Sequence, residues 1–244
     1  MNLKETQAVI LAGGLGTRLR PITELIPKPM IEINGKPFLE YQINQIRDSG
    51  IENIVLCVGY LGEIIQQHFG DGKNFGVKIK YSHERELLGT AGAIKKAESF
   101  IDSNPFIVLN GDCYNELSLT SIFSAHQNGN FPITMAIARA TNPTEQELVE
   151  VGNGVITQFL KRNTPEHSKH LKEKSSYLIN AGVYILDREI LGLIPSEKNF
   201  SLEQQIFPNL TSNMSAFYYG GYLKDLANVQ FCNELDQYMK EKQK

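Results

Sequence analysis

Cysteine is scarce in this sequence, and long hydrophobic runs are missing from it. The three cysteines, Cys57, Cys113 and Cys232, lie far apart and show no CxxC spacing. This pattern excludes a disulfide framework and a zinc site, and it favours a reduced, cytoplasmic protein. No apolar stretch approaches the length of a membrane span, and the first apolar run, residues 8–12, is too short for the core of a signal peptide. We therefore expect no association with a membrane.

A strong excess of positive charge is also missing. The formal net charge is -3 and the pI is about 6.0, values that argue against a protein that binds nucleic acid by neutralising phosphates. The chain has 244 residues, 41% of them hydrophobic, and can bury a full core. This length predicts one large α/β unit over residues 1–244.

Strand-like and helix-like segments alternate through the first half of the chain. Short apolar runs typical of buried parallel strands are separated by segments with helical periodicity. This order predicts a single doubly wound, Rossmann-like α/β domain with a mixed, mostly parallel sheet. The expected strands are 7–11, 53–59, 77–82 and 105–112, and the expected helices are 38–48, 61–70 and 89–101.

The second half is less regular. Strands are expected at 132–139, 154–160 and 177–186, a short helix ended by Pro208 at 201–210, and an exposed polar loop at 161–176. A final amphipathic helix is expected from about Asn228. Its buried side would carry Val229, Cys232, Leu235 and Met239. Four of the five histidines are interpreted as solvated or helix-surface residues rather than metal ligands: His68, His126, His167 and His170.

The first predicted strand ends on a glycine-rich loop, AGGLGTR at residues 12–18. Ligands of open α/β sheets bind beyond the carboxyl ends of the strands, and glycines let backbone N–H groups approach an anion. The loop lacks the lysine of a Walker A motif and the last glycine of a dinucleotide fingerprint. Taken alone, it is compatible with a phosphate-binding loop or with a simple tight turn.

Lys28 follows this loop and lies between Pro27 and Pro29. Because a following proline disfavours the helical region, we expect Lys28 to be extended and non-helical. Together with Arg18, it would offer one planar fork and one point charge to a polyphosphate. A surface polyproline turn would explain the rigidity of this segment, but not the glycine loop upstream.

The stretch LAGGLGTRLRPITELIPKPM (11–30) resembles the signature of the sugar-1-phosphate nucleotidyltransferases, GGxGTRLxPxTxxxPKPM, without a gap. Four further stretches match family landmarks in the same order: GKPFLEYQI, ELLGTAGAI, VLNGD and LINAGVYIL. The length and the stretch FSLEQQIFP are most similar to the branch that activates heptose 1-phosphate or mannose 1-phosphate with GTP. The resemblance implies a nucleotide-binding half at 1–112 and a sugar-phosphate-binding half at 113–244.

The resemblance also implies roles for single residues. Arg18 would hold the β- and γ-phosphates, and Lys28 would bridge the α-phosphate and the incoming sugar phosphate. Asp112 and Asp225 match the two acids that hold Mg²⁺; otherwise each would be a strand-end or helix cap. Asn110 is implied in substrate binding. The implied nucleotide-binding residues are Leu11, Ala12, Gly13, Gly14, Gly16, Thr17, Arg18, Gly89 and Thr90.

The sequence departs from the family pattern at the sugar end. The YG pair aligns with Gln146-Glu147, and the EKP triplet, which normally contacts the sugar and its phosphate, aligns with residues 161–163. The D-[IV]-G-x-P pattern reads DLANV at residues 225–229. Arg162 is the remaining candidate for the phosphate, and Asn180 for the sugar hydroxyls.

Three functions are compatible with these patterns. The first is a Mg²⁺-dependent enzyme that joins a nucleoside triphosphate to a sugar 1-phosphate for surface glycans, with GTP preferred. The second keeps this chemistry but uses cytidylyl, uridylyl or thymidylyl transfer to another phosphomonoester. The third is a non-catalytic regulator that binds nucleotide sugars. A homodimer is left open.

Overall fold

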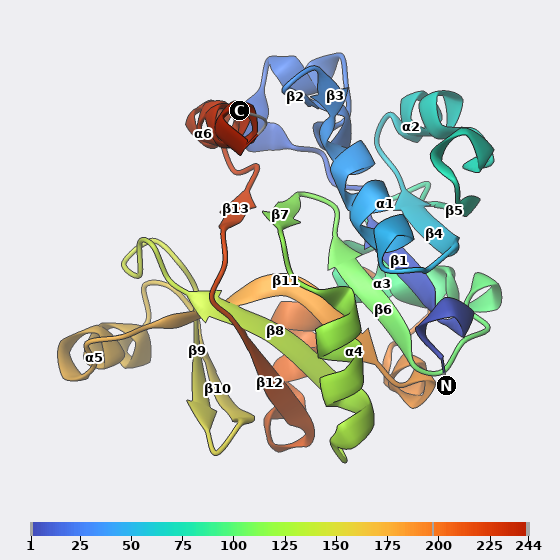
Figure 1. Ribbon diagram of the computed structural model, residues 1–244. Helices are drawn as coiled ribbons and strands as arrows, with labels where there is room; N and C mark the ends of the chain where they lie inside the picture. The colour runs from blue at the N-terminus through green and yellow to red at the C-terminus, as the bar shows by residue number, and fades with distance from the viewer. Residues whose placement is uncertain (1, 197, 243–244) are drawn as a thin grey trace.

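A nine-stranded mixed sheet runs through the molecule (Figure 1). The computed structural model describes residues 2–196 and 198–242. The strand order is β5-β4-β1-β6-β11-β8-β12-β10-β9. The strands of this sheet are β1 (Gln7–Leu11), β4 (Asn53–Val58), β5 (Lys78–His83), β6 (Phe106–Asn110), β8 (Ile133–Arg139), β9 (Leu148–Gly152), β10 (Val155–Leu160), β11 (Leu178–Leu186) and β12 (Met214–Tyr219).

The two halves of the sheet differ in strand direction. Strands β5, β4, β1 and β6 are parallel to one another. Among the described strands from β6 onward in the sheet order, only the β8–β12 pair is parallel, while β11 pairs antiparallel with β6 and β8, and β10 pairs antiparallel with β12 and β9. The prediction of a mixed sheet is confirmed, but "mostly parallel" is wrong for the second half. An apolar run shows that a strand is buried and does not show its direction.

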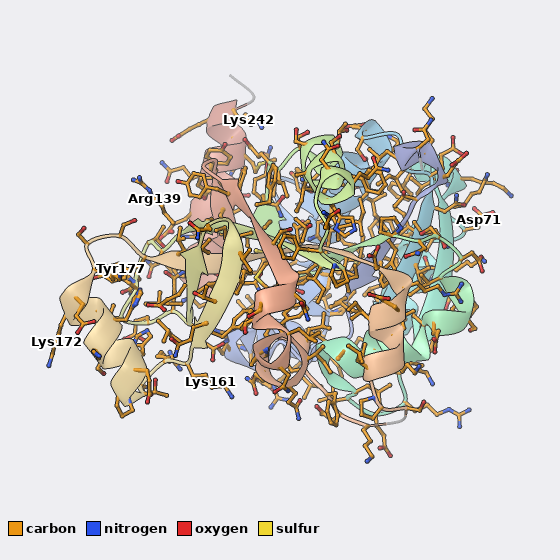
Figure 2. The ribbon with its side chains drawn as sticks, turned by 90° about the horizontal axis from the view of Figure 1, so that it is seen from below. Asp71, Arg139, Lys161, Lys172, Tyr177 and Lys242 are labelled. Atoms are coloured by element: carbon orange, nitrogen blue, oxygen red, sulfur yellow. The ribbon has the colours of Figure 1, made fainter. Side chains whose placement is uncertain are left out.

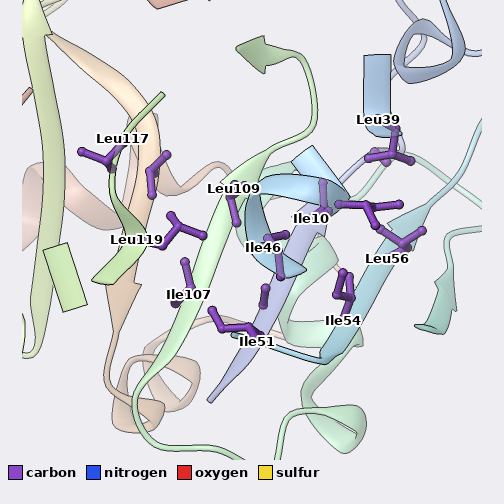
Figure 3. Packing of buried hydrophobic residues seen from close by; sticks show 14 of the residues in the cluster. Ile10, Leu39, Ile46, Ile51, Ile54, Leu56, Ile107, Leu109, Leu117 and Leu119 are labelled. Atoms are coloured by element: carbon purple, nitrogen blue, oxygen red, sulfur yellow. The ribbon is translucent and has the colours of Figure 1, made fainter. Parts of the chain in front are cut away.

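Helices cover both faces of the sheet, as the alternating pattern predicted. One buried cluster joins α1, α2 and α4 to one face, and Figure 3 shows Leu39 and Ile46 of α1 packed over Ile10 and Leu56. A second cluster joins α3 to the opposite face. The helices are α1 (Phe38–Asp48), α2 (Gly62–Phe69), α3 (Gly89–Lys96), α4 (Leu119–Asn128), α5 (Pro165–Glu173) and α6 (Val229–Lys242). None of the helices described is long and apolar enough to cross a membrane.

Two small ribbons lie outside the main sheet. Strands β2 (Glu32–Ile33) and β3 (Lys36–Pro37) form one, and β7 (Cys113–Asn115) and β13 (Leu223–Asp225) form the other. The second ribbon pairs Asp225 with Cys113 across the strands. Residues from the two halves of the chain therefore meet beside the end of β6.

The prediction of an exposed loop at 161–176 is wrong, because this polar segment contains α5. Thr164 accepts a hydrogen bond from His167 N at 3.2 Å and caps the helix, and Pro165 occupies its first turn. His167 and His170 are buried, not solvated, with His170 Nδ1 2.7 Å from Glu150 Oε1. Figure 2 shows α5 at the edge of the molecule, with Lys172 at its outer side. The helix was missed because its buried face carries histidines instead of aliphatic residues.

Several local predictions also need correction. His126 is buried rather than on the helix surface, and its Nδ1 lies 2.9 Å from Thr134 Oγ1. His68 is exposed, as expected. The helix expected at 89–101 ends at Lys96, before a separate 3₁₀ turn. The segment 201–210 forms a π-helical turn and a 3₁₀ turn that includes Pro208. On α6, Val229 is 46% exposed, while the other three apolar residues are buried as predicted.

Candidate active site

A cavity of about 480 Å³ lies beyond the carboxyl ends of β1 and β6 and beside the first turn of α3. This is the edge of a parallel sheet at which ligands bind. Most of the sequence-predicted site residues line it: Leu11, Ala12, Gly13, Gly14, Gly16, Thr17, Lys28, Gly89, Thr90, Asn110 and Asp112. Arg18, Arg162, Asn180 and Asp225 are absent from this lining.

Two glycines of the loop, Gly14 and Gly16, are needed for different reasons. A Cβ on Gly14 would meet nothing within 4 Å, so this position leaves its space to the cavity. Gly16 has a φ of +62°, and a Cβ there would lie 2.9 Å from Thr23 Cγ2 and 3.2 Å from Lys28 Cβ. Thr23 also donates a hydrogen bond to Gly16 O at 2.8 Å. Glycine at position 16 therefore allows the lysine segment to pack against the loop.

Lys28 is the first residue of a 3₁₀ turn, Lys28–Met30. The prediction of an extended conformation for this residue is therefore wrong. Pro27 is extended and its carbonyl accepts a hydrogen bond from Met30 N at 2.8 Å. A proline early in such a turn loses nothing, because its N–H would have no partner there. The side chain of Lys28 is buried, and its Nζ lies 2.6 Å from Asp112 Oδ2. The prolines thus hold a lysine that faces an acid.

Asp112 and Asp225 are brought together by the ribbon of β7 and β13, where Leu226 N donates to Asp112 O at 2.8 Å. Asp225 reaches solvent on one side. Even so, desolvation and then repulsion from Asp112 raise its pKa, while Lys28 and Arg18 act in the opposite direction. Arg18 is exposed beside the cavity and acts on the same carboxylate. The two acids and two cations predicted from separate parts of the sequence therefore belong to one electrostatic group.

The acidic pair fits a divalent cation that also binds a phosphate ligand. Two carboxylates that repel each other gain from a cation between them. Mg²⁺ prefers oxygen ligands and is commonly held by one or two carboxylates plus substrate phosphates and waters. Within the ranges 2–196 and 198–242, no group of three or more His, Cys, Asp or Glu side chains could hold a metal alone.

The far end of the cavity is built from the start of α3 and the segment 199–203. Gly89 has a φ of +69°, and a Cβ there would lie 2.5 Å from Phe200 O, so only glycine fits. Ala91 N donates to Phe200 O at 2.9 Å. Thr90 Oγ1 donates to Glu203 Oε2 at 2.7 Å and accepts from Leu202 N at 2.8 Å.

Sequence reasoning missed Tyr184 and Glu203. Tyr184 OH donates to Glu203 Oε1 at 3.0 Å and accepts from Asn180 Nδ2 at 2.6 Å. Asn110 Nδ2 lies 3.4 Å from the same hydroxyl. Desolvation and the nearby carboxylate raise the pKa of Tyr184 well above its usual value, which keeps the hydroxyl protonated as a donor. A partly buried network centred on Tyr184 thus joins Thr90 at one wall of the cavity to Asn110 at another.

A further missed residue is Glu84, which lines the cavity just after β5. Its Oε2 accepts a hydrogen bond from Leu88 N at 3.1 Å. Desolvation raises its pKa, and Lys96 and the Leu88 N–H oppose that shift. The polar stretch SHERE contains two glutamates, and nothing in it indicates that Glu84 faces the cavity while Glu86 is exposed.

The two sugar-end candidates are engaged elsewhere. Arg162 is exposed, and its Nη1 lies 3.3 Å from Glu145 Oε2. Asn180 supports the Tyr184 network, and its Oδ1 accepts from Gly182 N at 2.8 Å. Their contacts with a sugar phosphate stay predictions.

Comparison with known proteins found similar chains. A family described as nucleotidyl transferase matches residues 7–225. A uridylyltransferase for glucose 1-phosphate from Synechocystis is 37% identical over 87% of this chain and 57% of its own length. A D-glycero-alpha-D-manno-heptose 1-phosphate guanylyltransferase from Campylobacter jejuni is 36% identical over 83% of this chain and 86% of its own length. A mannose-1-phosphate guanylyltransferase from Mycobacterium tuberculosis is 30% identical over 94% and 63%, respectively.

Solved structures share the fold over almost the whole chain. The crystal structure of HddC from Yersinia pseudotuberculosis with GMP-PN has a TM-score of 0.81 and 28% identity, and it covers 96% of this chain and 99% of its own. The chain spans about three fifths of the length of several curated relatives that it matches.

Proposed function

Because the chain belongs to the nucleotidyl transferase family, as its signature predicted, we propose that it transfers a nucleoside monophosphate from a nucleoside triphosphate to a sugar 1-phosphate. Pyrophosphate is released and a nucleotide sugar is formed. The observation that carries this proposal is the ion pair between the buried Lys28 and the half-buried Asp112, whose Nζ and Oδ2 atoms lie 2.6 Å apart beside the open glycine loop. A lysine, an acid and bare backbone N–H groups in one cavity suit two phosphates that must be brought together.

The proposed reaction needs no general base from the protein. The nucleophile is an oxygen of a phosphate monoester, whose second pKa is about 6, so it is already anionic at neutral pH. A bond forms between this oxygen and the α-phosphorus, and the bond from the α-phosphorus to the bridging oxygen breaks. Its electron pair leaves with pyrophosphate. The main barrier is repulsion between polyanions, which cations and fixed positions lower.

The residues divide this work between them. The loop from Gly13 to Thr17 binds phosphate oxygens through its backbone. Lys28 would neutralise the α-phosphate and the attacking phosphate together, and Arg18 would stabilise the negative charge of the leaving pyrophosphate. Asp112 and Asp225 would hold Mg²⁺, which when bound supplies positive charge to the phosphate oxygens.

GTP and heptose 1-phosphate or mannose 1-phosphate are the substrates that we favour. Two relatives named above are guanylyltransferases for those sugars, and one matches most of its own length. The uridylyltransferase relative supports the alternative of another nucleotide or acceptor. A role in surface polysaccharide synthesis follows from such products. A cytoplasmic location fits the three buried, unpaired cysteines. A non-catalytic regulator that binds nucleotide sugars is the alternative function. A homodimer is a possible assembly of this chain.

Pyrophosphate release tests this function. The purified chain is mixed with Mg²⁺, each of GTP, CTP, UTP, dTTP and ATP, and a panel of sugar 1-phosphates that includes manno-heptose. We expect release with one pair, loss of release in Asp112→Ala, and normal release in the exposed control Asp102→Ala. Nucleotide binding without release for any acceptor would favour the regulator instead.

A further inference from the structure

We propose that Glu116 is a positioning residue, which fastens the ribbon of β7 and β13 to α6 and so holds Asp112 and Asp225 in place for Mg²⁺. The inference rests on the proposed function, because it takes these two acids as the ligands of the cation. It starts from the ribbon, which lies outside the main sheet although β7 begins directly after Asp112 and β13 ends on Asp225.

This ribbon has little stability of its own. Each strand has three residues, and a two-stranded ribbon in water needs packing against another element to be stable. Asp112 and Asp225 also carry like charges: desolvation and then repulsion from Asp112 raise the pKa of Asp225. Their repulsion opposes the pairing of the strands until a cation binds between them. Contacts from outside the ribbon must therefore hold it in place.

Helix α6 supplies an apolar support for the ribbon. Tyr114 of β7 and Leu226, which follows β13, belong to the same buried cluster as the apolar side of α6. The α6 members of this cluster are Cys232, Leu235 and Met239. Figure 1 shows that the chain passes from β13 into α6, with β7 beside β13. Apolar contacts are not directional, so they keep the ribbon near α6 without fixing its orientation.

Glu116, the residue that follows β7, supplies directional contacts. Its Oε1 accepts hydrogen bonds from Tyr114 OH at 3.0 Å, Tyr238 OH at 2.8 Å and Lys242 Nζ at 2.6 Å. Tyr238 and Lys242 belong to α6, so this one carboxylate ties the end of β7 to the helix. Desolvation acts to raise the pKa of Glu116, but the three hydrogen bonds lower it below its usual value, and the carboxylate stays ionised at neutral pH. An isolated ion pair at the surface contributes little, whereas several donors on one charge form a network.

Glu116 is also tied to the main sheet through its backbone. Its N–H donates to Tyr219 OH at 2.9 Å, and Tyr219 is the last residue of β12. The same hydroxyl donates to Tyr222 O at 2.9 Å, just before β13. The ring of Tyr222 stacks on that of Tyr238, with centroids 3.8 Å apart. Glu116 therefore connects β7 with the main sheet, with α6 and with the segment that leads into β13.

The position of Glu116 determines how it acts on the reaction. The three residues of β7 separate it from Asp112, and an extended strand of this length is a short and direct link. A shift at Glu116 therefore moves Asp112 relative to Asp225. Glu116 lies outside the cavity lining, so it acts through the two acids rather than on a substrate. Without its contacts, Mg²⁺ would have to reorder the ribbon as it binds, and the affinity for the cation would fall.

Binding of a divalent cation without nucleotide tests this inference. Mn²⁺ replaces Mg²⁺, and electron paramagnetic resonance measures the free ion as it is titrated into the chain. We expect Glu116→Gln to weaken Mn²⁺ binding by about tenfold, the lower end of the loss caused by removing a residue that orients metal ligands. Tyr238→Phe keeps the ring but removes one hydrogen bond to Glu116, and we expect a loss of about threefold. Glu241→Gln is the matched control, because Glu241 is an exposed glutamate of the same helix.

Two further measurements separate positioning from a purely structural role. Binding of GTP in EDTA should be equal in the wild type and in Glu116→Gln, because the glycine loop and the start of α3 that line the cavity are not part of the ribbon. In pyrophosphate release, the variant should need more Mg²⁺ to reach half of its maximal rate, and saturating Mg²⁺ should restore kcat. A residue needed only for the fold would lower the melting temperature and the rate at every Mg²⁺ concentration.

Three results contradict the inference. Equal Mn²⁺ affinity in the wild type and in both variants would overturn it. A parallel loss of Mn²⁺ binding and of GTP binding in EDTA would assign Glu116 to the stability of the fold and overturn it too. If Glu116→Gln does not fold, Tyr238→Phe decides between these outcomes. A wild-type chain that binds no Mn²⁺ would also overturn the inference, while pyrophosphate release by the same chain would leave the proposed transfer reaction standing.

Discussion

The two ends of the candidate site are built in different ways. The nucleotide end lies on parallel strands, with a bare glycine loop, a buried lysine and backbone contacts that only glycine permits. The acceptor end lies toward antiparallel strands, and Arg162, expected there, pairs with Glu145 at the surface. Glycine backbone therefore shapes the wall of the first end, whereas at the second the side chain expected to bind the acceptor is already paired with another residue.

The largest effect is expected at Lys28. Lys28→Met removes the cation that we propose lies between the two phosphates, and it leaves Asp112 without its partner at 2.6 Å. We expect kcat/KM to fall by at least about 10²-fold, the size found when one preorganised electrostatic group is removed. Steady-state pyrophosphate release measures it, with Lys36→Met as an exposed control. A decrease in kcat/KM of less than tenfold would show that Lys28 does not stabilise the transition state as proposed.

The second largest effect is expected at Gly14, where a substitution should weaken nucleotide binding without lowering the stability of the fold. A side chain at Gly14 meets nothing within 4 Å, so Gly14→Val should leave the melting temperature almost unchanged but fill space that the ligand needs. We expect nucleotide affinity to fall by about tenfold or more. Gly192→Val is the control, since that glycine also has open space around it but lies outside the cavity. Equal affinity in both variants would show that no ligand contacts Gly14.

The acceptor end should respond weakly at Arg162. Its exposed ion pair with Glu145 contributes about 0–1 kcal/mol to stability, and its side chain is not part of the cavity lining. We expect Arg162→Ala to change KM for the sugar 1-phosphate by less than about threefold. A large rise in KM with unchanged kcat would restore the role that the sequence predicted for it.

The smallest effect concerns the stability of the second half. Desolvation lowers the pKa of buried His126, partly offset by Asp187. The unfolded chain therefore binds this proton more readily, and the free energy of unfolding should fall as the pH drops through the unfolded value of about 6.5. Denaturant unfolding between pH 5 and pH 8 would show a shallower fall in His126→Gln, by on the order of 1 kcal/mol. If the free energy of unfolding falls equally with pH in the wild type and in His126→Gln, then His126 does not cause the pH dependence.

The sequence predicted those features that lie in one continuous stretch or are read from a motif. The glycine loop, Lys28 and the first helix are local, and their positions follow from chain order and period. The adjacency of Asp112 and Asp225 depends on a ribbon between distant segments, so the resemblance suggested it and local patterns did not. Glu84, Tyr184 and Glu203 could not be predicted, because each acquires its role only from distant partners. The histidine-lined face of α5 concealed a helix for a related reason.

The central claim is that the α-phosphorus of a nucleoside triphosphate moves to a sugar 1-phosphate in this cavity. The most direct measurement follows GTP labelled at the α-phosphorus, with Mg²⁺ and manno-heptose 1-phosphate or mannose 1-phosphate. We predict that the label appears in a nucleotide sugar and that the released pyrophosphate is unlabelled. If the label is recovered only in GTP, GDP or GMP while the chain still binds GTP and these sugar phosphates, the claim is wrong for them.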